Sequence, residues 1–456
     1  MRNNSVKNVV VGFDAGTTKL ACVAIDAVSS EIIFSKSIAV NAYIPFADPL
    51  RKEQDIQKIE KVFVKLVNEL FVLRNVNVLS IGFTGQMHGV IGLDAQNKPI
   101  TNLVTWEDKT GNARSKKSVG LAEYMCRKAP GVRVASGYGL VTLYKWIHIE
   151  KKKNIRKIIS LPDYLAARLT GKITNVIDPT FAHSFGAFDL NTGNWDKLIL
   201  KKLGIILSCL PEVIPTCSVC GFVNKKFSAS KIPVSVSIGD NQASFAGSVK
   251  DVSKSMLINI GTSAQICYLV SAAQKKSILK SIDGFDCELR PFDKKNFLVS
   301  VNLLNGGNTH RLLYDFFAAC GRDLFGIYDQ RKYDDLWEVM QKLALKPFLD
   351  ELPVMEPLFN GLRSNPGSKG SISGLNRNNF TPQALIKSVH AGMAHHYKSF
   401  VKISKPTLVG GGNGIRKNPS LRKEIEKAFG QKLILPDLHE EAAVGAATWF
   451  ADSLSK

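Results

Sequence analysis

The sequence predicts a mixed α/β protein built from two related halves. Its most informative feature is a turn of glycine and hydroxyl residues at 14–18 (Asp-Ala-Gly-Thr-Thr), which lies between two apolar runs. A similar turn at 259–263 (Asn-Ile-Gly-Thr-Ser) also lies between apolar runs, in the other half of the chain. Strand-like and helix-like patterns alternate elsewhere, as is typical of α/β proteins. The repeated strand–turn–strand unit therefore indicates a duplicated domain.

Each of these turns could bind a phosphate group. A hairpin of glycine and hydroxyl residues presents backbone N–H groups and side-chain O–H groups as donors. A single turn of this composition can equally be an ordinary connection between strands, but two copies favour a nucleotide between the halves. The residues expected at the phosphates are Gly16, Thr17, Thr18, Gly261, Thr262 and Ser263.

The length and composition fit two domains of a cytoplasmic protein. A chain of 456 residues is too long for one core. We place the boundary near Ile238, which gives domains 1–238 and 239–456 without a low-complexity linker. No apolar run reaches roughly 18 residues, and the N-terminus lacks an apolar signal region, so we expect neither a membrane span nor secretion. Cys217 and Cys220 form a lone C-x-x-C pair, so reduced thiols are expected rather than a zinc site.

The net charge of +21 is the unusual bulk property. Lysine and arginine are dispersed rather than concentrated in a tail, and the densest cluster, at 145–157, fits a solvated helix end or loop. A positive field would help to gather anionic nucleotides. We therefore expect small-molecule partners and no specific nucleic acid; a monomer and a homodimer both remain open.

Two strand ends are expected to approach the substrate. The amphipathic pattern of 55–74 predicts a helix with Asp55 as its N-cap, and 78–83 then predicts a buried strand that ends at 84–89. A further strand at 232–238 ends at 239–242, before a helix over 241–249. Ligands of open α/β sheets gather at the carboxyl ends of strands.

A glycine-rich segment near the C-terminus could receive a flat ligand. The strand at Leu408–Val409 leads into 410–414 (Gly-Gly-Gly-Asn-Gly), and a helical pattern covers 416–429. Glycine permits close approach of a ligand such as adenosine, although a plain helix-entry loop would look the same. No G-x-x-x-x-G-K-[ST] motif occurs, which excludes a P-loop enzyme.

Taken together, these motifs resemble the FGGY family of carbohydrate kinases over nearly the whole chain. The matching motifs, in order and spacing, are 14–18, 85–89 (Gly-Gln-Met-His-Gly), 106–108 (Trp-Glu-Asp), 162–165 (Pro-Asp-Tyr-Leu), 239–242 (Gly-Asp-Asn-Gln), 259–263 and 410–412. The resemblance implies two ribonuclease-H-like domains of the actin/hexokinase ATPase type, with an interdomain cleft. It also implies ATP and Mg²⁺ as cofactors.

Within the family, 85–89 looks most like ketose kinases such as xylulokinase and sedoheptulokinase. The stretches 136–144 and 304–308 look closer to sedoheptulokinase. The implied reaction is ATP-dependent phosphorylation of a ketose primary hydroxyl, with sedoheptulose 7-phosphate as the expected product. Xylulokinase or another pentulose kinase is the alternative, and a non-catalytic sugar or nucleotide sensor is the alternative from another class.

The resemblance also implies roles for single residues. Phosphoryl transfer to an alcohol requires a base, a metal at the phosphates and donors around the γ-phosphate. Asp240 is the implied base, and Asp14 with Asp240 the implied metal ligands, Asp14 through water. Phosphate donors from opposite domains would couple catalysis to domain closure. The implied adenine and ribose walls are Gly306, Gly307, Gly411 and Gly412.

The sugar is expected to contact a second group of residues, which lies mostly in the first half. These residues are Gln86, Met87, His88, Trp106, Asp108, Asp240 and Asn241. His88 could instead be a buried, hydrogen-bonded histidine, and Trp106 a core side chain. Relatives commonly show W-x-D-x-R, whereas Thr110 occupies the arginine position here. Thr110 cannot make a bidentate guanidinium contact, and Lys109 would point away if the segment were extended.

Overall fold

The structure, a computed structural model, describes residues 6–113, 119–281, 286–436 and 439–455. The chain forms two compact units, described separately below. The first comprises Met1–Gly247, Arg290–Lys295 and His439–Lys456, and the second comprises Ser248–Leu289 and Asn296–Leu438. The first unit thus extends past the predicted boundary at Ile238 and includes Asp240, which the sequence analysis assigned to the C-terminal domain.

A seven-stranded sheet is the centre of the first unit. Its strands are β1 (Lys7–Ala15), β2 (Lys19–Asp26), β3 (Ile32–Ala39), β5 (Val76–Gly85), β13 (Val219–Phe222), β14 (Pro233–Ser235) and β15 (Ile238–Gly239). The order is β13-β14-β5-β1-β2-β3, and β15 also pairs with β5. Strands β1, β2 and β3 form an antiparallel meander, whereas β5 runs parallel to β1.

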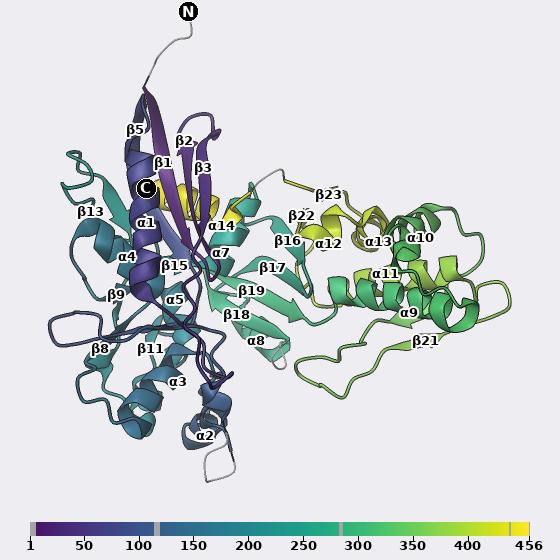
Figure 1. Ribbon diagram of the computed structural model, residues 1–456, viewed down its shortest axis with the longest axis horizontal. Coiled ribbons are helices and arrows are strands. Elements are labelled where there is room, and N and C mark those ends of the chain that lie inside the picture. Colours follow the sequence, from purple (N-terminus) through teal and green to yellow (C-terminus); the bar gives the residue numbers. More distant parts are fainter. Residues whose placement is uncertain (1–5, 114–118, 282–285, 437–438, 456) are drawn as a thin grey trace, which may run out of the picture. The chain divides into compact units, whose positions relative to one another are not determined.

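Both faces of this sheet are buried, because β1 alternates between two hydrophobic clusters. Val9, Val11 and Phe13 pack with α1 (Ile56–Phe71) and α4 (Leu161–Thr170) on one face. Val10 packs with α14 (Glu441–Leu454) on the other face. Successive side chains of a strand point to opposite faces, which explains the division. Figure 1 shows α14, in yellow, beside the purple strands of the N-terminus.

The rest of the first unit packs around a separate hydrophobic cluster. Its helical elements are η1 (Thr110–Asn112), α2 (Leu121–Lys128), α3 (Gly139–Tyr144), η2 (Lys145–Ile149), α5 (Pro179–Phe185), α6 (Lys197–Leu203) and η3 (Leu207–Cys209). Its short strands are β4 (Glu53–Gln54), β6 (Ile91–Leu93), β7 (Leu103–Val104), β8 (Lys157–Ile159), β9 (Val176–Ile177), β10 (Phe188–Asp189), β11 (Asn194–Trp195) and β12 (Glu212–Val213). Helix α7 (Asp240–Ser248) follows β15 directly.

The second unit repeats the sheet of the first. Its strands are β16 (Ser255–Ile260), β17 (Ala264–Ser271), β18 (Cys287–Pro291), β19 (Asn296–Leu303), β22 (Thr407–Gly411) and β23 (Leu433–Ile434). An antiparallel meander, β16-β17-β19, is followed on the other edge by the parallel strands β22 and β23. The same order, β3-β2-β1-β5-β14, occurs in the first unit. The predicted duplication is confirmed.

Helices form the remainder of the second unit. They are α8 (Lys275–Ser281), α9 (Gly307–Phe325), η4 (Gln330–Tyr333), α10 (Leu336–Leu345), α11 (Pro382–Ser399), α12 (Asn413–Arg416) and α13 (Pro419–Phe429), and β20 (Val354–Glu356) pairs with β21 (Ser371–Ser373). Aromatic and aliphatic side chains of α9, α10 and α11 share one core. In the part of the chain that the structure describes, no helix has both the length and the apolarity needed to span a bilayer.

Two predicted elements are interrupted. The expected strand over 232–238 consists of β14 and β15, because Ser237 donates its N–H to Asp163 instead of to a neighbouring strand. The expected helix over 416–429 is divided into α12 and α13 at Asn418, since Pro419 cannot donate a helical hydrogen bond. The helix predicted over 55–74 forms as α1, with the Asp55 side chain accepting from the N–H groups of Gln57 and Lys58.

Candidate active site and nucleotide pocket

The first glycine-threonine turn forms the β1–β2 hairpin and is connected to the expected sugar residues. Ala15 pairs with Leu20, so Gly16, Thr17 and Thr18 close the hairpin. The Thr17 hydroxyl accepts a hydrogen bond from Trp106 Nε1 at 3.0 Å and donates to Gln86 Oε1 at 3.5 Å. Gln54, which the sequence analysis missed, donates to the Thr17 carbonyl at 2.7 Å and accepts from Gln86.

Asp14 and Asp240 come together through the register of the sheet. Asp14 is paired with Thr84 across the β1–β5 ladder, and Ile238 is paired with the same Thr84 across the β15–β5 ladder. Strands β1 and β15 thus reach the same level of β5 from its two edges. Asp240, the first residue of α7, follows at once. The two carboxyl groups are therefore held at one end of the sheet.

Burial and like charges make these two carboxyl groups unusual. Burial raises the pKa of Asp14 above its ordinary value, and the charges of Asp240 and Glu440 raise it further, against the opposing effect of Lys19. Burial also raises the pKa of Asp240, while the Arg290 guanidinium lowers it. Neither Glu440 nor Arg290 was predicted, because the segments that bring them here are distant in sequence. Lys19 and Glu440 form an ion pair at 2.5 Å.

The two carboxyl groups fit a magnesium ion. Asp14 Oδ1 is buried and has no hydrogen-bond partner among the described residues, so an ion would satisfy it. Within the described residues, no group of three or more histidine, cysteine, aspartate or glutamate side chains could hold a metal. Magnesium commonly keeps several waters and takes one or two carboxylates together with substrate phosphates. Asp14 and Asp240 match that requirement.

Two buried aspartates, both missed as functional residues, position the strand end that precedes Asp240. Asp163 accepts from the Ser237 N–H at 2.9 Å, and burial raises its pKa to about 6. Asp178 accepts from the Thr180 hydroxyl at 2.7 Å, and that hydroxyl accepts from the Gly239 N–H at 2.8 Å. Burial raises the pKa of Asp178 to about 7. The helix-capping pattern of Ser160 and Asp163 was the available sequence signal.

The predicted sugar residues Met87 and His88 have different environments. Met87 is buried, and its thioether lies so close to Gly239 that a Cβ there would be 2.9 Å from the sulfur. His88 is half-buried with φ of 72°. Its Nδ1 lies 2.6 Å from the Ser184 carbonyl, and its ring stacks on Tyr138 with centroids 4.3 Å apart. His88 is thus hydrogen-bonded, while its ring joins the 136–144 segment.

Trp106 is not a core residue, since half of its side chain is exposed (50%). Asp108 is buried and already accepts from the N–H groups of Lys52 and Thr110, at 2.9 and 3.0 Å, and from the Thr110 hydroxyl. The segment is not extended: a turn at 106–107 precedes η1, which begins at Thr110. Lys145 of η2 donates to the Thr110 hydroxyl at 2.8 Å, so its ammonium group lies beside this segment.

Asn241 follows Asp240 and is hydrogen-bonded to Arg290, the same side chain that lowers the pKa of Asp240. Arg290 donates from Nη1 to Asn241 Oδ1 at 3.3 Å. Phe292 stacks on Trp449 of α14 and lies edge-on to Phe245 of α7. Those aromatic contacts hold the short segment 290–295 in the first unit.

The second unit contains a cavity of about 1180 Å³ that four of the expected nucleotide residues line. These four are Gly261, Thr262, Gly306 and Gly307. Gly307 and Asn308 donate their N–H groups to the carbonyls of Gly261 and Thr262, at 2.9 and 3.0 Å. The second glycine-threonine turn, which closes the β16–β17 hairpin, is therefore joined to the start of α9. A cavity of this size can enclose a nucleoside.

Gly411, Gly412 and Ser263 are near this cavity but are not among the residues that line it. Gly412 has φ of 77°, and a Cβ there would be 2.3 Å from the Ile260 carbonyl. This glycine is thus required by its backbone and by close approach to β16. Asn413 and Gly414, the next residues, line the cavity instead. The residues at the cavity thus follow the predicted Gly411 and Gly412 by two positions.

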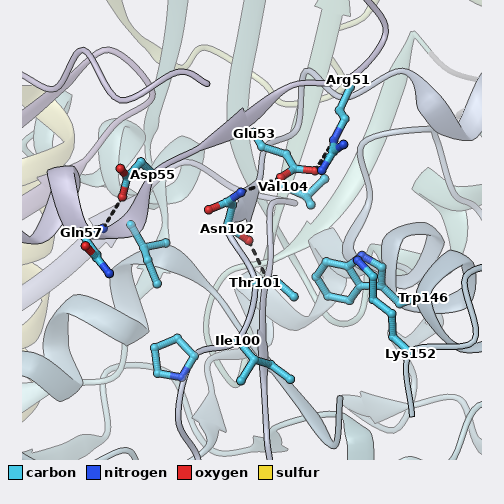
Figure 2. Close-up of a pocket in the computed structure, with 12 residues that line it drawn as sticks. Arg51, Glu53, Asp55, Gln57, Ile100, Thr101, Asn102, Val104, Trp146 and Lys152 are labelled. Atoms are coloured by element: carbon cyan, nitrogen blue, oxygen red, sulfur yellow. Dashed lines mark hydrogen bonds and ion pairs between the residues drawn. The ribbon is translucent and has the colours of Figure 1, made fainter. Parts of the chain in front are cut away.

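Figure 2 shows another cavity, of about 400 Å³, in the first unit. Its polar side chains bind one another: Arg51 pairs with Glu53 at 2.7 Å, and Asn102 donates to Glu53 at 3.0 Å. Asp55 on its rim caps α1. The predicted site residues are not among those that line it. We assign no function to this cavity.

Comparison with known proteins identifies the family. Residues 9–247 match the N-terminal domain of the FGGY family of carbohydrate kinases. The chain belongs to this family. It is therefore an enzyme of the carbohydrate kinase class, and the resemblance noted from its motifs is confirmed.

Curated relatives of this kinase differ in the substrate that they are named for. A glycerol kinase of Alteromonas mediterranea is 25% identical, covering 96% of this chain and 89% of its own. The human sedoheptulokinase is 23% identical, covering 97% of both chains. A gluconokinase of Bacillus subtilis is 23% identical, covering 96% of this chain and 86% of its own.

Solved structures confirm the predicted fold class. A xylulose kinase from Rhodospirillum rubrum has a TM-score of 0.77 at 18% identity, over 98% of this chain and 90% of its own. A Plasmodium falciparum glycerol kinase, solved with ADP, has a TM-score of 0.69 at 20% identity, over 97% and 88% of the two chains. The two sheets of this kinase thus belong to the two-domain fold of sugar kinases.

Proposed function

We propose that this kinase transfers the γ-phosphoryl group of ATP to a primary hydroxyl of a ketose, with sedoheptulose as the preferred acceptor. The observation on which the proposal depends is the partly buried Asp240, which the shared register on β5 brings to the same end of the sheet as Asp14. Xylulose or another pentulose is the alternative acceptor.

Asp240 is suited to the role of general base. Asp240 is partly buried, and the loss of solvent raises the pKa of its carboxyl group, which makes the carboxylate a better proton acceptor than that of a solvated aspartate. The hydrogen bonds at Ser237 and Gly239 fix the backbone immediately before it, which limits the directions in which the carboxylate can point. Arg290 balances its charge while the group is ionised.

Asp14 and Asp240 would hold the magnesium ion, which supplies charge neutralisation at the phosphates when bound. In the second unit, the backbone at Gly261–Thr262 and Gly306–Gly307 would surround the nucleotide phosphates, with the cavity enclosing the nucleoside. The phosphoryl group has to pass from this nucleotide to an alcohol activated by Asp240. That requirement is part of the proposal.

A ketose is favoured by the group around His88. Tyr138 belongs to the segment that resembles sedoheptulokinase, and it stacks on His88 of the ketose-kinase-like motif. The exposed face of Trp106 offers a surface on which the apolar side of a sugar can pack. The match to human sedoheptulokinase over 97% of both chains further supports this acceptor.

A panel of acceptors tests the proposal directly. The purified kinase would be supplied with ATP and magnesium and with sedoheptulose, D-xylulose, D-ribulose, gluconate or glycerol, and ADP release and the phosphorylated carbon would be determined. We expect the highest kcat/KM for sedoheptulose, with the phosphate on the primary hydroxyl of C7. A clear preference for another acceptor would reject this choice. Binding of ATP and a ketose without ADP release would favour the sensor alternative.

A further inference from the structure

A chain of buried hydrogen bonds joins the start of α13 to the wall of the nucleotide cavity. His390, on α11, lies with Nδ1 3.0 Å from Ser420 Oγ and with Nε2 3.0 Å from His310 Nδ1. His310, on α9, has its Nε2 3.2 Å from Gln341 Nε2 on α10. Asn418 Nδ2 is 3.3 Å from His390 Nε2. The members that line the cavity are His310, Gln341 and Asn418.

The orientation of the Asn418 amide determines which ring nitrogen carries the proton in each histidine of this hydrogen-bond chain. Asn418 is the N-cap of α13, and its Oδ1 accepts from the Leu421 N–H at 2.9 Å. Its NH₂ group must therefore face His390. A hydrogen donated by Asn418 requires His390 Nε2 to be an acceptor, so the proton of neutral His390 is on Nδ1 and is donated to Ser420.

The same reasoning extends to the next two residues. Because His390 Nε2 is an acceptor, His310 must donate to it from Nδ1, and this leaves His310 Nε2 as an acceptor. Gln341 must then present its NH₂ group to His310. Both histidines are neutral, since burial lowers the pKa of His310 to about 4 and lowers that of His390 well below its ordinary value.

The amide oxygen of Gln341, at the end of these hydrogen bonds, has no donor within the described part of the protein. Gln341 Oε1 is buried and has no hydrogen-bond partner among the described residues, although Gln341 lines the cavity. A buried acceptor without a partner is costly. A ligand in the cavity that supplies an N–H donor would satisfy it.

We propose that the Asn418–His390–His310 chain fixes the Gln341 amide so that its oxygen selects a purine carrying an exocyclic amine over one carrying a carbonyl at the same position. The proposal deepens the nucleotide role in the proposed function and depends on it. Gln341 is the specificity-determining residue, and the other three are positioning residues. An adenine amine would donate to Gln341 Oε1, whereas a hypoxanthine carbonyl would place two acceptors together.

The affinities for ADP and for inosine diphosphate, measured by calorimetry without any ketose, test this proposal. We expect the wild type to bind ADP more tightly by roughly tenfold to a hundredfold, the cost of a mispaired buried polar group. Gln341→Met should weaken ADP binding and reduce the ratio to about one. An unchanged ratio in Gln341→Met would overturn the assignment.

Asn418→Asp provides a sharper test, because it reverses one hydrogen bond without removing the cap. The aspartate still accepts from Leu421, but it offers an acceptor to His390, whose Nε2 must then carry the proton. His310 must protonate on Nε2, and Gln341 must turn its NH₂ toward the ligand. The preference should then shift to inosine diphosphate. Asn376→Asp is the matched control, since Asn376 caps an exposed turn away from the cavity.

Nuclear magnetic resonance of ¹⁵N-labelled histidine gives a readout that is independent of activity. In the nucleotide-free wild type, His310 and His390 should both carry their proton on Nδ1, and Asn418→Asp should move both protons to Nε2. A wild-type His310 protonated on Nε2, an Asn418→Asp variant that keeps the ADP preference, or absence of ADP binding would each overturn the proposal. Failure of the ketose panel alone would reject the proposed acceptor and leave these affinities unaffected.

Discussion

At the scale of single residues, the direction of the Asp240 carboxylate is determined by backbone geometry. Asp240 begins α7 directly after β15 ends at Gly239. Just before it, the Ser237 N–H donates to the buried Asp163 and the Gly239 N–H donates to the buried Thr180. If Asp240 is the base, as proposed, its position depends on Asp163 and Thr180, which lie outside the residues expected to contact the sugar.

Replacement of Asp240 by asparagine should abolish most turnover. We expect kcat to fall by roughly 10²–10⁴-fold or more, because that is the usual contribution of a general base. The affinity for ADP, measured by calorimetry, should be unchanged. Asp48→Asn is the control, since Asp48 is exposed and caps the turn at Leu50. Turnover close to that of the wild type would remove Asp240 from the mechanism.

Trp106 should affect acceptor binding more than catalysis. We expect Trp106→Ala to raise the KM for the ketose by roughly two- to tenfold, because a stacked ring contributes about 0.5–1.5 kcal/mol. Trp106→Phe keeps a ring but loses the hydrogen bond to Thr17, so it should show an intermediate KM. If steady-state kinetics gave an unchanged KM for Trp106→Ala, the indole would have no part in sugar binding.

His310 should make the stability of the protein depend on acidity. Its pKa of about 4 in the folded state is below the unfolded value of about 6.5. The stabilisation due to the neutral ring is thus complete above pH 6.5 and is lost as the pH falls toward 4. Between pH 6.5 and pH 5 this amounts to at most about 2 kcal/mol.

Urea unfolding of the wild type and His310→Gln at the two pH values measures that effect. The wild type should lose more stability than the variant on acidification. The comparison must be between variants, because the raised pKa values of Asp163 and Asp178 act in the opposite direction. Protonation of these two carboxyl groups stabilises the folded protein as the pH falls through the same interval. Replacement of the exposed His395 by glutamine is the control. Equal losses in the wild type and His310→Gln would contradict the assignment.

At the scale of elements, α14 is packed against the first sheet at backbone distance. A Cβ at Gly12 of β1 would lie 1.8 Å from the Ala443 carbonyl, and one at Gly82 of β5 would lie 2.0 Å from the Ala446 carbonyl. On α14 itself, a Cβ at Gly445 would lie 1.8 Å from the Ala243 carbonyl of α7. These glycines allow the helix to approach the sheet so closely.

Gly12→Ala should therefore destabilise the first unit. The added methyl group must separate β1 from α14, and overpacking of this kind costs about 1–3 kcal/mol or more. Thermal unfolding should show a lower Tm for the first unit and little change for the second. Gly367→Ala is the control, because the nearest atom to its Cβ would be 3.5 Å away, in the Asn365 side chain. An unchanged Tm for Gly12→Ala would show that α14 can move away from β1 at little cost in stability.

Prediction from sequence succeeded where the signal was local. The two hairpins, α1 with its Asp55 cap and the strand ends near Asp14 and Asp240 could all be read from short patterns. Arg290, Glu440 and Asp178 could not, because their places near Asp14 or near the strand end at Asp240 depend on pairing between distant segments. The Asn418 break was missed since a proline that starts a second helix resembles one inside a continuous pattern.

At the scale of the whole molecule, the lysines and arginines behind the charge of +21 are dispersed along the sequence rather than concentrated in a tail. We expect binding to mixed-sequence DNA or RNA to be weak and to fall steeply with salt, since such binding depends on counterion release. Fluorescence anisotropy with a labelled duplex at 50 and 200 mM salt would measure it. Tight, sequence-dependent binding at the higher salt would indicate a nucleic-acid partner.

The first unit is assembled from three stretches of chain, the last of which carries α14. A ribosome synthesises that stretch only after the second unit, so one apolar face of β1 and β5 stays uncovered until then. Any shortened product that ends before residue 439 would expose this face permanently, and quality-control proteases recognise such surfaces. Asp14 and Asp240, which lie before residue 248, would then lose part of the packing that supports their sheet through the loss of a segment that follows the second unit in the sequence.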